Sequence, residues 1–228
     1  VYFFLLIRHF KEAFACEEMR VYLGVIAAST LAVAGNIFHL YGNVWQSLRY
    51  SFFQVASIIT TTGYATTDFN MWPTFSKAVL VLLMFFGACA GSTGGGIKTT
   101  TIFVLAQEIR CIFSKQRPGA FRRALPANAI AKASTIGLLG MLVVCCTTFL
   151  LCILEPGLPF ISLLFEAVSA YSTAGLSTGI TAQLCLAAKL VLIFTMYTGR
   201  VGAFTLLSLW VERPEPNAHF TEEAITIG

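Results

Sequence analysis

The chain has 228 residues, of which 57% are apolar and only 11% are charged, and its formal net charge is +4. Because a typical soluble domain carries about 25% charged residues, this composition excludes a water-exposed globular surface and predicts an all-α polytopic membrane protein. The seven cysteines form no C-x-x-C pair and lie mostly in apolar runs, which favours buried thiols over a disulfide framework or a zinc site.

Residues 1–59 contain the first predicted elements. The chain begins VYFFLLIRH, which lacks the basic start and the cleavage site of a signal peptide, and we interpret residues 1–19 as the end of a preceding helix and a cytoplasmic linker. The run 21–41 reaches the length of about 20 apolar residues that a helix needs to cross a bilayer. The amphiphilic stretch 44–59 is shorter and predicts a re-entrant half-helix, which a membrane tolerates only within protein or beside a water-filled cavity.

The remaining elements repeat this order. An apolar run at 74–110 is interrupted by the glycine-rich stretch GACAGSTGGGIKTT at 87–100. A second span is predicted at 130–154, a second half-helix at 158–171, and a last span at 184–210 that contains Arg200. We therefore predict four full spans and two half-helices, arranged as unit A (20–112), a basic loop (113–129), unit B (130–212) and a tail (213–228).

The two units are related by an internal repeat. A shift of 112 residues, which places Arg20 on Lys132, aligns them without a gap. The other matches include glycines and polar residues, which shared hydrophobicity alone would not align: Phe53/Phe165, Ser57/Ser169, Thr61/Thr173, Gly63/Gly175, Thr66/Thr178, Lys77/Lys189 and Gly87/Gly199. Each unit crosses the membrane twice, so both have one orientation. The excess of Lys and Arg before and between the units predicts that this side and the tail are cytoplasmic.

A Ser/Thr-rich loop with a glycine follows each half-helix. The loops read TTTGYATTD at 60–68 and STAGLSTG at 172–179. A potassium filter needs backbone carbonyls turned toward a dehydrated ion, and Gly and Thr allow the chain to adopt that shape. The negative end of each half-helix dipole would also face the cation. Two such loops at one repeat offset favour an ion filter over ordinary tight turns.

The chain resembles the Trk/Ktr/HKT superfamily of cation transporters, and within it the TrkH/KtrB-like membrane subunits, over nearly its whole length. The stretches that carry the resemblance are TTTGYATTDF (60–69), FFGACAGSTGGGIK (85–98), STAGLSTGIT (172–181) and MYTGRVGAFTLL (196–207). In that family four span–half-helix–span units surround one pore, and each supplies one filter loop. The chain is similar to the C-terminal half, so we expect two further units in a longer protein; the alternative is the pairing of two chains.

The resemblance implies a role for each filter residue. Potassium would be coordinated by the backbone carbonyls of Thr62, Gly63, Ala174 and Gly175. The filter segments that the resemblance implies are Thr61, Thr62, Gly63, Tyr64, Thr173, Ala174, Gly175 and Leu176.

The glycine-rich stretch corresponds in the resemblance to an intramembrane gate loop. Each glycine lowers helix propensity by about 1 kcal/mol relative to Ala, so a continuous helix is not expected there. Arg200 lies in an apolar span, where a charge facing lipid costs several kcal/mol, and we expect it to face the pore. The implied gate residues are Gly87, Gly91, Ser92, Thr93, Gly94, Gly95, Gly96, Lys98 and Arg200. The alternatives are a passive helix kink, a bond of Arg200 to Glu166 or to a carbonyl, and a Lys98 side chain that only snorkels to the cytoplasm.

The roles of two acidic residues are open at this point, and three alternatives to a transporter are considered: a hydrolase, a phosphate-binding protein and an assembly subunit. Glu166 either attracts cations or caps a neighbouring element, and Asp68 either concentrates cations at the mouth or is an exposed turn carboxylate. The G-x-S-x-G match at 175–179 lacks the preceding strand of a hydrolase, and Ile97 interrupts the match of 91–99 to a phosphate-binding loop. A non-conducting structural or assembly subunit is the more serious alternative to a transporter.

We therefore expect potassium uptake, with sodium as the other candidate ion, into a bacterial cell without covalent chemistry and without a covalently bound cofactor. The resemblance implies a homodimer and cytoplasmic RCK-type nucleotide-binding subunits as partners, besides the missing half and the lipid bilayer. No nucleic-acid partner is expected. The expected location is the cell membrane, with a cytoplasmic C-terminus.

Overall fold

The structure, a computed structural model, describes residues 17–86, 94–114, 119–120, 123–124 and 127–208. The α-helices are α3 (Glu17–Tyr41), α4 (Val44–Ile59), α5 (Thr74–Phe85), α6 (Thr99–Ser114), α7 (Ala127–Leu154), α8 (Phe160–Ser172), α9 (Leu186–Val201) and α10 (Ala203–Ser208), with a 3₁₀ turn, η1, at Phe69–Met71. The short strands β1 (Gly119–Ala120) and β2 (Arg123–Ala124) pair antiparallel inside the predicted basic loop. The fold is therefore helical, as predicted, apart from this small hairpin.

Helices α3 and α7 have the length and composition of membrane-spanning segments. Within them, Met19–Tyr41 and Asn128–Leu154 are the two stretches of the described chain that are long and apolar enough to cross a bilayer as one helix. The α7 side chains Leu138 and Ile153 are each 70% exposed, and Phe149 is 74% exposed. Water would penalise so much exposed apolar surface, whereas lipid does not. This exposure fits a helix that faces hydrocarbon.

The other two predicted spans are each built from two helices. The chain leaves α5 at Phe86, and α6 begins only at Thr99. In the second unit α9 ends at Val201, and Gly202 then adopts a φ of +92° before α10. An L side chain would be strained at such a φ, so the break in the last span occurs at Gly202, two residues beyond the charged Arg200.

Local sequence explains where both half-helices begin. The side chain of Asn43 caps α4 by accepting a hydrogen bond from the Trp45 backbone N–H at 2.9 Å. Pro159 immediately precedes α8, and its fixed φ and missing N–H suit the start of a helix. The α4 bounds agree with the predicted 44–59, and α8 lies within two residues of the predicted 158–171.

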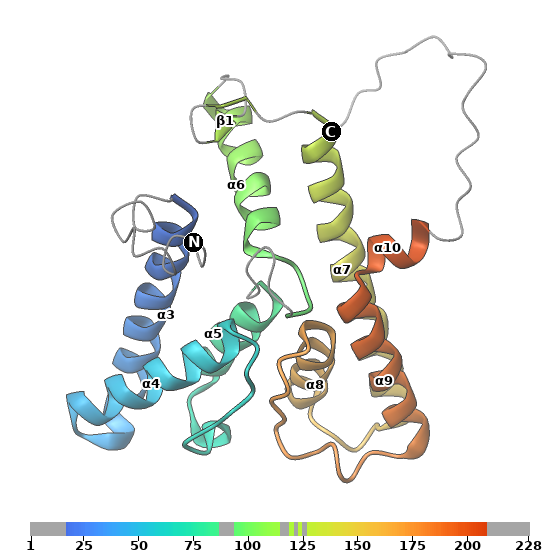
Figure 1. Cartoon of the computed structure of the whole chain (residues 1–228). Helices are drawn as coiled ribbons and strands as arrows, with labels where there is room; N and C mark the ends of the chain where they lie inside the picture. Colours follow the sequence, from blue (N-terminus) through green and yellow to red (C-terminus); the bar gives the residue numbers. More distant parts are fainter. Residues whose placement is uncertain (1–16, 87–93, 115–118, 121–122, 125–126, 209–228) are drawn as a thin grey trace, which may run out of the picture.

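The two units lie side by side and meet through the second half-helix. Helices α3, α4 and α5 pack together in one unit, and α7, α8 and α9 pack together in the other (Figure 1). Across the boundary, α5 contacts α8 and α6 contacts α7. The main apolar core includes Ile58 of α4, Leu80 of α5 and Phe165 of α8. Side chains from both units therefore surround α8.

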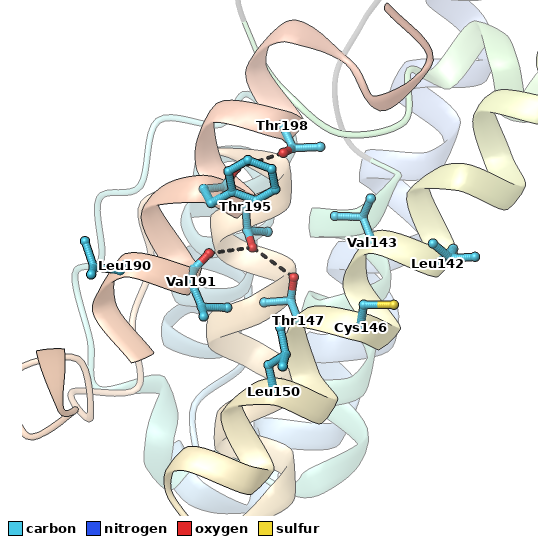
Figure 2. Close-up of a pocket in the computed structure, with 10 residues that line it drawn as sticks. Leu142, Val143, Cys146, Thr147, Leu150, Leu190, Val191, Thr195 and Thr198 are labelled. Atoms are coloured by element: carbon cyan, nitrogen blue, oxygen red, sulfur yellow. Dashed lines mark hydrogen bonds between the residues drawn. The ribbon is translucent and has the colours of Figure 1, made fainter. Parts of the chain in front are cut away.

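A polar pair lies inside the otherwise apolar contact between α7 and α9. The hydroxyls of Thr147 and Thr195 are 2.8 Å apart, and Thr195 also donates to the Val191 carbonyl at 2.9 Å. Because the Thr195 hydrogen is used on Val191, Thr147 is the donor between the two hydroxyls. Figure 2 shows this pair in an open groove of about 410 Å³, which is lined mainly by apolar side chains. Such interhelical bonds contribute about 0.6–2 kcal/mol in membranes.

Candidate ion filter and gate

The two predicted filter loops adopt the same backbone conformation. Thr61 and Thr173 each have a φ of +53°, whereas Gly63 and Gly175 have φ values of +77° and +78°. In the part of the chain that the structure describes, these two threonines are the non-glycine residues with positive φ. A β-branched residue rarely adopts this conformation. Its recurrence at the repeat offset therefore indicates that the surrounding structure imposes it.

A serine on each half-helix fixes the outer end of its loop. The Ser57 hydroxyl donates to the Tyr64 carbonyl at 2.6 Å, and the Ser169 hydroxyl donates to the Leu176 carbonyl at 2.5 Å. These two serines are aligned by the repeat, as are their partners. Each loop is thus tied back to its own half-helix just beyond the glycine.

Backbone bonds fix the inner end of each loop in the same way. The Thr62 N–H donates to the Ser57 carbonyl at 2.8 Å, and the Ala174 N–H donates to the Ser169 carbonyl at 3.0 Å. The last carbonyls of a helix need such partners. The loops are therefore closed at both ends, and the glycines lie at corresponding positions between the ties.

The two loops approach each other at their glycines. A β-carbon built on Gly63 would lie 2.5 Å from the Ala174 carbonyl oxygen and 3.3 Å from Gly175 backbone atoms. A β-carbon built on Gly175 would meet only the Gly63 α-carbon, at 3.9 Å. The structure thus brings together the residues that the sequence predicts at the filter, and Gly63 is the position with less space.

The described end of the glycine-rich stretch lies against the second loop. The Gly95 N–H donates to the Thr173 hydroxyl at 2.9 Å. A β-carbon on Gly95 would lie 2.9 Å from the Thr173 methyl group and 3.0 Å from the Gly199 carbonyl oxygen, and one on Gly199 would overlap the Tyr171 carbonyl oxygen. Three backbone segments, from α9, the end of α8 and the glycine-rich stretch, therefore meet where side chains do not fit.

Ile97 anchors the end of the glycine-rich stretch in the core. Its side chain is 2% exposed, and its N–H donates to the Phe85 carbonyl at 3.4 Å. The chain therefore leaves α5 and returns beside it before α6 begins. A buried isoleucine at this position leaves the stretch unsuited to cradle a phosphate, in agreement with the sequence argument. The predicted gate residues Gly87, Gly91, Ser92 and Thr93 lie outside the described residues.

The predicted gate cations lie near this junction with accessible side chains. Arg200 is exposed in the last turn of α9, and its side chain forms no ion pair or hydrogen bond with another described residue. The anticipated alternative, an ion pair with Glu166, is not formed, because residues 177–181 bind that carboxylate. Lys98 is half-buried immediately before α6, where its carbonyl accepts from Thr101 and Ile102.

The structure gives both acidic residues a capping role that the sequence left open. The Asp68 carboxylate accepts from the Asn70 N–H at 2.9 Å and caps η1. Glu166 is buried and receives hydrogen bonds from the loop beyond Gly175. Sequence reasoning named capping as one of two alternatives for Glu166 but missed the residues that it binds. An available signal was a single carboxylate in an apolar half-helix followed by a run of hydroxyl side chains.

The geometry does not favour the enzymatic alternatives. The Ser177 hydroxyl donates to Glu166 at 2.5 Å and follows the half-helix α8, so it lacks the strand–turn–helix context of a hydrolase nucleophile. The described residues contain no group of three His, Cys, Asp or Glu side chains placed to hold a metal ion. The five described cysteines are free thiols.

Comparison with known proteins agrees with this fold. A family model described as TrkH, cation transport protein, matches residues 30–219. The Ktr system potassium uptake protein B of Bacillus subtilis is 31% identical over 195 residues, which cover 85% of this chain and 43% of that protein. The potassium/sodium uptake protein NtpJ of Enterococcus hirae is 35% identical over 177 residues, covering 74% of this chain and 39% of that protein.

A solved structure is also similar. The potassium transporter TrkH from Vibrio parahaemolyticus matches with a TM-score of 0.73 and 27% sequence identity, over 85% of this chain and 44% of that chain. The chain thus spans less than half of the length of each of these three proteins. The resemblance stated from the motifs is confirmed, and the proteins that the chain matches are named as ion transporters. The chain belongs to the TrkH family of cation transport proteins.

Proposed function

We propose that the complete protein containing this chain takes up potassium across the bacterial cell membrane through a filter of backbone carbonyls. The observation that carries the proposal is the pair of loops with matching φ values, matching serine ties and glycines in contact. The names of the Ktr and Trk relatives, which describe potassium uptake, support the choice of ion. The second ion named for NtpJ makes sodium the competitor to test.

In this proposal the carbonyls of Thr62, Gly63, Ala174 and Gly175 replace the water shell of the ion. Thr61 and Thr173 provide the left-handed turn that lets the following residues extend toward the ion. The ties of Tyr64 and Leu176 to their half-helices hold the outer end of each loop still. The C-terminal ends of α4 and α8 lie at the loops, and their dipoles stabilise a cation there.

We further propose that the rest of the same protein, beyond the residues of this chain, completes the ion path. Residues 20–112 and 130–212 would form two of four pore units, and the remaining length of the protein would supply the other two. The lengths of the relatives support this arrangement, because the chain covers only 39–44% of the three similar proteins described above. A homodimer on cytoplasmic nucleotide-binding subunits, with a cytoplasmic C-terminus, belongs to the same proposal.

The gate in this proposal is the glycine-rich stretch together with Arg200. The hydrogen bond from the Gly95 N–H to the Thr173 hydroxyl supports a gate beside the second loop. Arg200 follows Gly199 at the same junction, and its accessible guanidinium, which has no ion-pair partner among the described residues, would repel cations when the path is closed. Displacement of the stretch would both open the path and release the Thr173 hydroxyl.

Rubidium uptake by cells that lack their own potassium uptake systems tests the proposed function. Cells that express the complete protein should accumulate rubidium, and potassium should compete more strongly than sodium. Cells that carry the empty vector provide the control. A protein that reaches the membrane at normal abundance but conducts no monovalent cation would contradict the proposal and favour the non-conducting assembly subunit.

A further inference from the structure

Glu166 is a buried carboxylate whose oxygen atoms are occupied by the segment that follows the second filter loop. The side chain is 5% exposed. Its Oε1 atom accepts from the Ser177 hydroxyl at 2.5 Å and from the Thr178 N–H at 3.0 Å, and its Oε2 atom accepts from the Thr181 hydroxyl at 3.0 Å. The Thr178 hydroxyl also donates to Oε1, at 3.4 Å. Hydrogen bonds to an ionised group are the stronger kind, so this clamp opposes displacement of residues 177–181.

The clamp acts on the same loop as the Ser169 tie. Residues three apart on a helix share a face, so Glu166 and Ser169 both project from α8 toward the loop. Ser169 holds the Leu176 carbonyl, and Glu166 holds the residues immediately after it. The chain is therefore attached to α8 continuously from the residue after Gly175 outward. A shift of this segment would move the Gly175 carbonyl directly.

The first unit lacks this clamp, although it keeps the serine tie. The repeat aligns Glu166 with Gln54, Ser177 with Ala65, and Thr181 with Phe69. Gln54 is 1% exposed, and neither polar atom of its amide has a hydrogen-bond partner among the described residues. The carboxylate and the hydroxyl donors Ser177 and Thr181 are thus present together in unit B and replaced together in unit A, whereas Thr178 keeps its counterpart Thr66.

The clamped segment also supports the outer end of the first loop. The Asn70 side chain donates to the Thr178 carbonyl at 3.3 Å, and the Asn70 N–H binds Asp68. Phe69 stacks on Phe165, the residue before Glu166, with ring centroids 5.3 Å apart. Fixing Thr178 therefore fixes a support for both loops.

We propose that Glu166 is a positioning residue that holds the two filter loops at the spacing that favours potassium over sodium. The inference rests on the proposed function, because it assumes that ions pass between these loops. Glu166 would not contact the ion, since its oxygens are used by protein donors. Its contribution would be to keep the carbonyls from closing around the smaller ion, a role in which hydrogen-bond geometry matters more than charge.

Substitution by methionine separates the clamp from side-chain volume. The selectivity ratio is the strength with which potassium competes with rubidium uptake, divided by the strength with which sodium does. Glu166→Met in the complete protein should lower this ratio about tenfold, the scale set by losing one hydrogen bond to a charged group. Glu166→Gln keeps an acceptor for Ser177 and Thr178 and should restore the ratio to within about threefold of wild type, because hydrogen bonds between neutral groups are weaker but present. Membrane abundance is measured for every variant.

Gln54→Met is the matched control, because it changes the aligned residue of the first unit without removing a hydrogen bond within the described structure. It should leave the ratio within about twofold, since replacing an unpaired buried amide by an apolar group is close to neutral. If Glu166→Met does not fold, Thr181→Val removes the Oε2 contact and the contact of Thr181 with the Ser177 hydroxyl, but keeps the Oε1 contacts. It should shift the ratio in the same direction.

The outcomes separate the inference from the proposed function. An unchanged ratio in Glu166→Met would overturn the inference. Where that variant does not fold, an unchanged ratio in Thr181→Val would do so. In either case a conducting wild type would still uphold the proposed function. Glu166→Gln as poor as Glu166→Met would also overturn the inference, because charge and not position would then matter. A wild type that conducts no cation would overturn the proposed function and this inference with it.

Discussion

Replacing Gly63 by alanine is expected to lower potassium uptake by the complete protein at least about tenfold. The new β-carbon would lie 2.5 Å from the Ala174 carbonyl oxygen, at a φ of +77°. The left-handed conformation alone costs an alanine about 1–2 kcal/mol, and the overlap with a backbone atom forces the two loops apart. A rise of ~1.4 kcal/mol in the barrier slows passage about tenfold, so uptake should fall by at least about that factor. Rubidium uptake, normalised to membrane abundance, measures the effect.

Alanine substitutions at two other glycines test whether the loss of uptake comes from the contact between the loops. Gly175→Ala has a similar φ of +78° but more space, so its loss of uptake should be smaller than that of Gly63→Ala. Gly42→Ala has a φ of +63° with no atom within 4 Å, so it carries backbone strain without touching the loops. It should keep the selectivity of the wild type. Equal losses in all three variants would show that general destabilisation, and not the loop contact, explains the result.

Replacing Gly199 by alanine is expected to prevent correct packing of α9 against α8. Its β-carbon would lie 1.8 Å from the Tyr171 carbonyl oxygen, a backbone atom that cannot turn aside as a side chain can. Core overpacking commonly costs about 1–3 kcal/mol, and an overlap with backbone lies at or beyond the upper end of that range. We expect a large loss of folded protein extracted from the membrane and a lower thermal stability of what remains, measured in detergent.

Gly95→Ala provides a milder change at the same junction. Its β-carbon would lie 2.9 Å from a Thr173 methyl group, which belongs to a side chain, and 3.0 Å from the Gly199 carbonyl oxygen. The variant should fold but change the rate of uptake, because the glycine-rich stretch would shift away from the filter. Gly35→Ala in α3, with no atom within 4 Å, is the control. A stable Gly199→Ala protein with wild-type uptake would contradict the close approach of α9 to α8.

Local features of the sequence predicted much of the fold. The limits of α4 follow from an amphiphilic run with Asn43 before it and a Thr-Gly loop after it, and both signals are local. The 112-residue repeat predicted that the two loops correspond, and their φ values agree to within one degree at both the threonines and the glycines. A repeat transfers local geometry reliably because both copies meet the same packing requirements.

The contacts between distant segments were beyond sequence reasoning. Gly95 meets Thr173 across 78 residues, and no periodicity reports such an approach. The last span was predicted over 184–210, but α9 ends at Val201, because Gly202 adopts a positive φ that a continuing helix does not allow. Glu166 appeared as an isolated charge, because its donors follow it by 11 to 15 residues and reach it only when the loop turns back.

Locating the bound ion tests the central claim most directly. Crystals of the complete protein grown with thallium or rubidium in place of potassium would reveal the ion by its anomalous scattering. We predict density between the two loops, within coordination distance of the Thr62, Gly63, Ala174 and Gly175 carbonyls, and its loss in Gly63→Ala. Ion density confined to other parts of a transport-active protein, with none between these loops, would contradict the account.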